Sequence, residues 1–152
     1  MITGIYAALC GLLLVVLYAR VSQRRLATKI GAGTGGDAVL EQRVRAHANL
    51  IESAPLVLLL LYLVEQTGLD AWAVHAFGAA FLIARLLHAQ GMSGSTGRST
   101  GRFYGSIGTL LILAALSVLL LALGIAALLV VATHDARVRA RFARTLQLPP
   151  PR

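Results

Sequence analysis

The chain has 152 residues, of which 57% are hydrophobic and 13% are charged, and its mean hydropathy is +0.76. Soluble domains contain about 45–50% apolar and about 25% charged residues, so this composition excludes an ordinary water-soluble domain and indicates an integral membrane protein. The formal net charge is +8, but the basic residues are divided among the flanks of apolar segments. We therefore predict no binding to nucleic acid, which would need them gathered on one soluble face.

Four apolar stretches follow one another along the chain, and each approaches the roughly 20 residues that a membrane-spanning helix needs. They show no alternation with a period of two, which disfavours strands. We predict a single all-α domain, an integral membrane four-helix bundle that contacts membrane lipid. Its helices are expected at about 2–20, 38–66, 70–90 and 102–133, followed by a basic tail at 134–152.

The connections between these helices differ in charge, and this difference predicts an orientation. The first connection is rich in arginine and lysine, the third contains Arg98 and Arg102, and residues 65–70 of the second contain two acids and no base. The positive-inside rule therefore places the first and third connections in the cytoplasm. Four spans put the tail on the side opposite to these two connections. The arginines of the tail therefore favour the opposite orientation. The tail itself is expected to form a short interfacial helix against acidic lipid headgroups.

The second expected helix begins with polar side chains that a lipid-facing helix would not carry. Arg45, Asn49 and Glu52 are spaced i, i+4 and i+7, which places them on one face of a helix. Ionisable groups inside a spanning segment usually face a bundle interior or a polar cavity, because contact with hydrocarbon is costly. This face is therefore a candidate binding site. No two histidines have the spacing of metal ligands on one helix, so we predict no metal site.

Two motifs carry a resemblance to a known family. One comprises Gly35-Gly36-Asp37, then Arg43-Val44-Arg45-Ala46-His47-Ala48-Asn49, then Glu52 and Pro55. The other is Ile83-Ala84-Arg85-Leu86-Leu87-His88-Ala89-Gln90-Gly91. Together they resemble signatures of the MAPEG family, the membrane-associated proteins in eicosanoid and glutathione metabolism. The small four-helix members of its bacterial branch are the more similar ones.

The resemblance implies a homotrimer of left-handed four-helix bundles in the bacterial inner membrane, with glutathione bound as co-substrate between neighbouring subunits. In the enzymes of the family, an arginine, an asparagine and a glutamate of the second helix help to hold the tripeptide. These positions match Arg45, Asn49 and Glu52 here. His47 is a further candidate contact, although a structural histidine at a helix interface is an equally good interpretation.

The resemblance also suggests residues on the third and fourth helices. Arg85 matches the third-helix arginine, and His88 replaces a tyrosine that often follows it. Arg85 alternatively forms a structural ion pair with Glu52. The catalytic arginine near the start of the fourth helix, which stabilises the glutathione thiolate in the eicosanoid branch, matches Arg102 best and Arg98 second.

The chemistry of glutathione supports the same residues independently of the resemblance. Its two carboxylates, one ammonium and thiol call for several cations, an anion and an amide in one pocket. Arginine suits this task because it pairs with carboxylates through two hydrogen bonds and keeps its proton when buried. An arginine beside the sulfur would lower the thiol pKa and increase the fraction of nucleophilic thiolate.

Two functions remain open on the sequence. The first is a glutathione-dependent transferase or peroxidase that acts on lipophilic small-molecule electrophiles, with the thiolate stabilised by arginine. The second is a non-catalytic MAPEG-fold membrane protein that binds a lipid or a partner protein. The second is favoured by Ser53 and Met92, which stand where the resemblance places tyrosines. A small multidrug exporter is less well supported, because the first apolar stretch contains no carboxylate for proton coupling.

Overall fold

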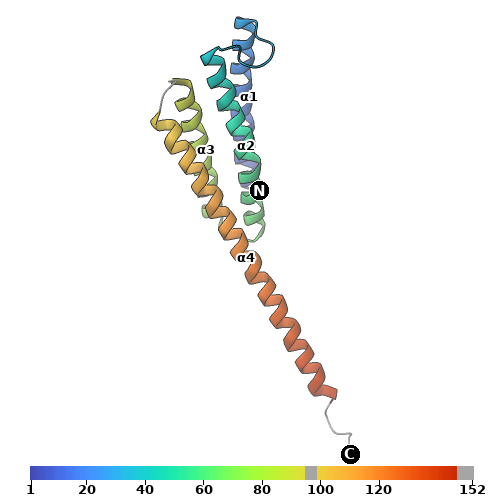
Figure 1. The fold of residues 1–152 in the computed structure, drawn as a ribbon. Helices are drawn as coiled ribbons and strands as arrows, with labels where there is room; N and C mark the ends of the chain where they lie inside the picture. The colour runs from blue at the N-terminus through green and yellow to red at the C-terminus, as the bar shows by residue number, and fades with distance from the viewer. Residues whose placement is uncertain (95–98, 147–152) are drawn as a thin grey trace, which may run out of the picture.

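The computed structural model describes residues 1–94 and 99–146, with side chains for residues 1–92 and 99–142. This part of the chain forms four α-helices and no strand (Figure 1). Each helix is long and apolar enough to cross a membrane. The all-α, four-helix prediction is confirmed, whereas the left-handed sense and the trimer stay predictions. The helices are α1 (Thr3–Thr28), α2 (Ala38–Gln66), α3 (Ala71–Gly94) and α4 (Thr100–Leu146).

Three helices extend further than the apolar pattern predicts, α3 by only a few residues to Gly94. α1 continues to Thr28 instead of ending near residue 20, because its polar last turns are held by the neighbouring segments. Arg24 binds Asp37, and Arg43 Nη1 donates to the carbonyl oxygen of Arg20 at 2.6 Å. α4 continues to Leu146 instead of ending near 133, since alanine and arginine, both strong helix formers, dominate its last turns.

Asp37 joins the start of α2 to the end of α1. As the N-cap of α2, its Oδ1 accepts from the backbone N–H of Leu40 at 2.6 Å, which satisfies a helix donor that would otherwise lack a partner. The same carboxylate accepts from Arg24 Nε at 3.1 Å and Arg24 Nη2 at 2.7 Å. The hydrogen bonds from Arg24, and then the bond from Leu40, hold the pKa of the Asp37 carboxyl below its ordinary range.

At the other end of the bundle, α2 caps α1. Glu65, in the last turn of α2, accepts from the backbone N–H groups of Ile2 at 2.6 Å and Thr3 at 3.0 Å. The first N–H groups of a helix have no partner within the helix and carry a partial positive charge, so a carboxylate stabilises them. α1 is therefore tied to α2 at both of its ends.

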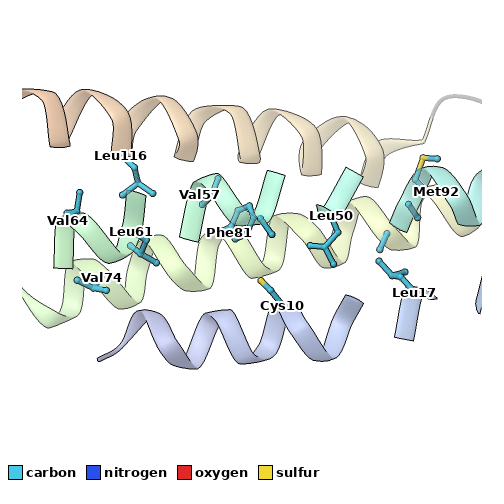
Figure 2. Packing of buried hydrophobic residues seen from close by; sticks show 13 residues of the cluster. Cys10, Leu17, Leu50, Val57, Leu61, Val64, Val74, Phe81, Met92 and Leu116 are labelled. Atoms are coloured by element: carbon cyan, nitrogen blue, oxygen red, sulfur yellow. The ribbon is translucent and has the colours of Figure 1, made fainter. Parts of the chain in front are cut away.

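The hydrophobic core runs along the bundle between the helices. Figure 2 shows Val57 and Phe81 near its middle, and Val64, Val74 and Leu116 together toward one end. All five side chains are 1% exposed or less. Leu116 is the last fully buried residue of α4, and from Gly124 through Phe142 every residue is exposed. Figure 1 shows that α4 continues well beyond the other three helices.

Small residues let α3 and α4 approach closely at the other end of the bundle. A Cβ atom added at Gly105 would lie 2.6 Å from the carbonyl oxygen of Ala84 and 2.7 Å from the backbone nitrogen of His88. A Cβ atom at Gly101 would lie 2.7 Å from the carbonyl oxygen of Leu87. Such close backbone contact is a common way for helices to pack in a membrane, because apolar side chains gain little when they move from lipid to another helix.

We predict that Gly105→Ala lowers stability by about 1–3 kcal/mol, because the added methyl group meets backbone atoms that cannot move aside. Gly124→Ala is the matched control: a Cβ there meets nothing within 4 Å, so the better helix propensity of alanine should raise stability by up to about 1 kcal/mol. Thermal unfolding in detergent, followed by helical circular dichroism, measures both. Equal effects of the two variants would contradict the close α3–α4 contact.

We also predict that the Asp37 contacts make stability depend on pH. Because folding lowers the pKa of this carboxyl, its contribution is full above the unfolded value of about 3.9. It is lost as the pH falls through the lower folded value. Asp37→Asn keeps the cap but removes the charge, so it should flatten the acid limb of a melting-temperature profile. Asp37→Ala should lower the melting temperature further at neutral pH. An unchanged acid limb in Asp37→Asn would exclude this contribution.

Candidate functional site

A cavity of about 530 Å³ lies between α2, α3 and α4, at the end of the bundle where α2 begins. Its volume falls within the range of about 300–1,000 Å³ that is usual for small-molecule sites. Three helices contribute to the lining, so the cavity depends on the packing of the bundle. The lining residues are Ala38, Glu41, Gln42, Arg45, Ala48, Asn49 and Glu52 of α2, His88 and Met92 of α3, and Arg102 of α4.

The polar face of α2 forms one wall of this cavity. Arg45, Asn49 and Glu52 all line it, as their helical spacing predicts. Glu41 and Gln42 line it as well, and sequence reasoning missed them. The signal was present, because Glu41 lies four residues before Arg45 and continues the same face by one turn.

Arg85 lies beneath the cavity and is not part of its lining. Its side chain is 3% exposed. Nη1 donates to Asn49 Oδ1 and, at 3.2 Å, to Ser53 Oγ, and Nη2 donates to the carbonyl oxygen of Gly105 at 2.7 Å. The guanidinium thereby joins α2, α3 and α4. Nη1 and Nη2 are bound to these partners, whereas Nε is buried without a hydrogen-bond partner among the described residues. Arg85 does not form the ion pair with Glu52 considered above as an alternative.

His88 and Arg102 complete the opposite wall of the cavity. His88 is buried on α3, and Arg102 is half-buried in the first turn of α4. Ser99 sets the position of this turn: its Oγ donates to the carbonyl oxygen of Gly91 at 2.8 Å and accepts from the backbone N–H of Arg102 at 3.3 Å. Ser99 therefore fastens the start of α4 to the end of α3, a role that its N-cap chemistry could have suggested from sequence.

One of the candidate residues is not brought to the cavity. The His47 ring lies 5.9 Å from the ring of Tyr18 on α1, and it is not among the lining residues. Arg98 lies outside the described residues. The structure thus gathers Arg45, Asn49, Glu52, His88 and Arg102 around one cavity, with Arg85 in contact with Asn49 from below; their role in binding stays a prediction.

The charges of the lining suit a ligand that carries both signs. Arg45 and Arg102 present guanidinium groups, whereas Glu41 and Glu52 present carboxylates. Arginine binds carboxylate or phosphate groups through paired hydrogen bonds, and a carboxylate binds an ammonium group. A zwitterionic molecule therefore fits this cavity better than a purely apolar one.

These features define a class of protein: an integral membrane four-helix bundle with a polar cavity at one end. The sequence model of the MAPEG family matches residues 3–122, and the chain belongs to this family. It is 33% identical, over 91 residues, to the inner membrane protein YecN of Escherichia coli K12. The same identity holds for YecN of Escherichia coli O6:H1, and in both cases the alignment covers 60% of this chain and 70% of the relative.

We predict that Arg85→Lys destabilises the protein by about 1–3 kcal/mol, because a single ammonium group cannot replace a planar fork that reaches three partners on two neighbouring helices. Arg43→Lys is the matched control, since Arg43 makes one hydrogen bond to a backbone carbonyl that lysine can replace. Thermal unfolding in the same detergent compares the two. A loss no larger in Arg85→Lys than in Arg43→Lys would contradict the linking role of Arg85.

Proposed function

We propose that this protein is a glutathione-dependent transferase or peroxidase-like enzyme of the bacterial inner membrane that acts on lipophilic electrophiles. The observation that carries the proposal is the cavity in which Arg45, Asn49, Glu52 and Arg102 meet. Membership of the MAPEG family supports the proposed chemistry, and the Escherichia coli relatives, which are named inner membrane proteins, support the proposed location alone. The first and third connections would lie in the cytoplasm, where the positive-inside rule puts them.

Several polar groups of glutathione have a counterpart in the lining. Arg45 is suited to a carboxylate, and Glu52 to the ammonium group. Asn49 accepts from Arg85 through Oδ1, so its Nδ2 group is the part that can donate to a peptide carbonyl of the ligand. In this proposal Arg85 acts as a positioning residue, because it reaches the ligand through Asn49.

The reaction requires that the thiol become a thiolate. A free thiol of this kind has a pKa of about 8.5, and each unit by which a neighbouring guanidinium lowers it corresponds to about 1.4 kcal/mol. Arg102 is the proposed neighbour of the sulfur. With an aryl halide, the thiolate forms a sulfur–carbon bond, the carbon–halogen bond breaks, halide leaves with the electron pair, and the thiol proton passes to solvent.

The proposed assembly is a homotrimer with the ligand held between subunits. In the single chain, Arg45 and Glu52 are exposed although they line the cavity. A charged face in the membrane region needs cover from hydrocarbon. A neighbouring copy placed against α2 would close the open side of the cavity and supply this cover.

A second candidate function is a non-catalytic protein that binds a lipid or a partner protein in the same cavity. It is favoured by two residues that stand where the resemblance places tyrosines. Met92 brings a thioether instead of a phenol to the lining, and the Ser53 hydroxyl is engaged with the Asn49 carbonyl and with Arg85. Both changes affect the activation of the thiol more than the binding of the tripeptide.

We predict that glutathione raises the melting temperature of the purified protein in detergent. A ligand at 100 times its Kd stabilises the folded state by about 2.7 kcal/mol. Arg45→Ala should abolish most of this shift, whereas Arg43→Ala should retain it, because Arg43 lies on the same helix but outside the lining. S-methylglutathione tests whether binding needs the thiol. If neither glutathione nor S-methylglutathione shifts the melting temperature, glutathione is excluded as the ligand.

We predict that Arg102→Ala lowers the rate of conjugation of a chromogenic aryl halide by at least about tenfold, the loss expected for one unit of thiol pKa, while the thermal shift with glutathione persists. The pH–rate profile of this variant should shift to higher pH, because the thiolate then forms at higher pH. Binding of glutathione without any turnover by the wild-type protein would favour the second candidate function.

A further inference from the structure

The apolar part of α4 is longer than a bilayer is thick. It runs from residue 104 to residue 133, which is about 45 Å at 1.5 Å per residue, whereas the hydrocarbon core measures about 30 Å. The excess lies at the end away from the cavity, because Leu116 already packs beside Val64 and Val74 near the end of the bundle (Figure 2). Glu65 and Asp70 mark the polar limit of the bundle there.

Within the described residues, no other helix covers this excess. Leu128 is 72% exposed, Leu129 61% and Val130 67%. A straight α4 would therefore carry a fully apolar stretch past the polar end of the bundle and into water, which is unfavourable by the area of apolar surface exposed. The match to the MAPEG family ends at residue 122, so this segment also lies beyond the part of the chain that the family defines.

Gly124 stands where α4 leaves the bundle. Apart from proline, glycine is the least favourable residue inside a helix. A Cβ atom added at Gly124 would meet nothing within 4 Å. Close packing therefore does not explain a glycine here, unlike Gly105. α4 is one continuous helix through this position, but glycine weakens a helix locally, so a bend costs less here than at a neighbouring alanine or leucine.

The segment after Gly124, residues 125–146, is here called the distal arm, and its charge suits an acidic surface. It contains four arginines and one acid, Asp135. His134, Arg137 and Arg141 share one helical face, and Val131, Val138 and Phe142 share the face beside it. A helix with adjoining apolar and basic faces is typical of segments that lie in the membrane interface.

We propose that α4 bends at Gly124 and that the distal arm lies along the bilayer surface, bound to anionic phospholipid headgroups on the side opposite the cavity. This placement puts Val131, Val138 and Phe142 among the outer parts of the acyl chains and leaves Arg137 and Arg141 at the level of the phosphates. It is independent of the proposed catalysis, because none of the residues that line the cavity belongs to the arm.

Spin labels along the arm of the full-length protein test this placement. In a Cys10→Ala background, single cysteines replace Val131, His134, Val138 or Phe142, and the protein is reconstituted in nanodiscs that contain phosphatidylglycerol. For each label we compare its accessibility to oxygen with its accessibility to a water-soluble nickel complex. The ratio of the two should be several-fold higher at the three apolar positions than at position 134. The three apolar positions should also report similar depths.

Each other pattern of accessibility would overturn the proposal. Labels that are all reached by nickel would show a straight arm in water. Depths that change steadily from 131 to 142 would show a steeply tilted continuation of the span. Protection of the apolar positions from both reagents, with dipolar broadening between labels, would show that a second copy covers the arm.

Two sets of variants separate the bend from the charge. Gly124→Ala favours the straight helix by about fivefold, as the propensity difference of about 1 kcal/mol implies. It should therefore raise nickel accessibility at position 138. Ala126→Leu, which keeps helix propensity, is its control.

The double variant Arg137→Gln with Arg141→Gln should weaken surface binding by about 25-fold, or about fivefold for each charge. The corresponding double lysine variant should restore it. Identical behaviour in nanodiscs of neutral phosphatidylcholine alone would contradict the role of acidic headgroups.

Discussion

The structure depends on one buried cation. A guanidinium inside an apolar bundle is costly unless most of its donors find acceptors, because lipid and hydrocarbon side chains offer none. Arg85 finds them for Nη1 and Nη2, with Asn49 and Ser53 of α2 and the backbone of Gly105 on α4. Its Nε is buried without a partner among the described residues. The distance and rotation between three helices are therefore set by where these acceptors lie, and the glycine at position 105 is needed to bring α4 within reach.

This constraint also supports the cavity. Asn49 belongs both to the lining and to the Arg85 network, so the cavity is joined to the buried contacts between the helices, while Arg45 and Glu52 of the lining stay exposed. Ser99 adds a second fixed point by joining α4 to the end of α3. Because Arg45 and Glu52 make none of these contacts, they can be substituted without breaking the Arg85 network.

Helix number and the polar face of α2 could be predicted from the sequence, because apolar length and i, i+4 spacing are local properties. Two features could not be obtained in this way. The partners of Arg85 depend on how close α4 comes, and a sequence without an alignment does not show that Gly105 is the contact point. The end of α1 was placed too early because Arg24 and Asp37, although close in sequence, show their pairing only once the intervening loop is folded.

The distal arm helps to explain why the basic tail and the basic first and third connections favour opposite orientations. Basic residues flank both sides of the bundle, and the positive-inside rule treats those near helix ends as evidence for the cytoplasm. On the proposal made here, the arginines after Gly124 are held by headgroups of the leaflet that they meet, and anionic lipids attract basic segments on whichever face they occur. Their position then reflects the excess length of α4 rather than a choice of compartment. The first connection, with its tightly bound Arg24 and Arg25, is left as the stronger determinant of orientation.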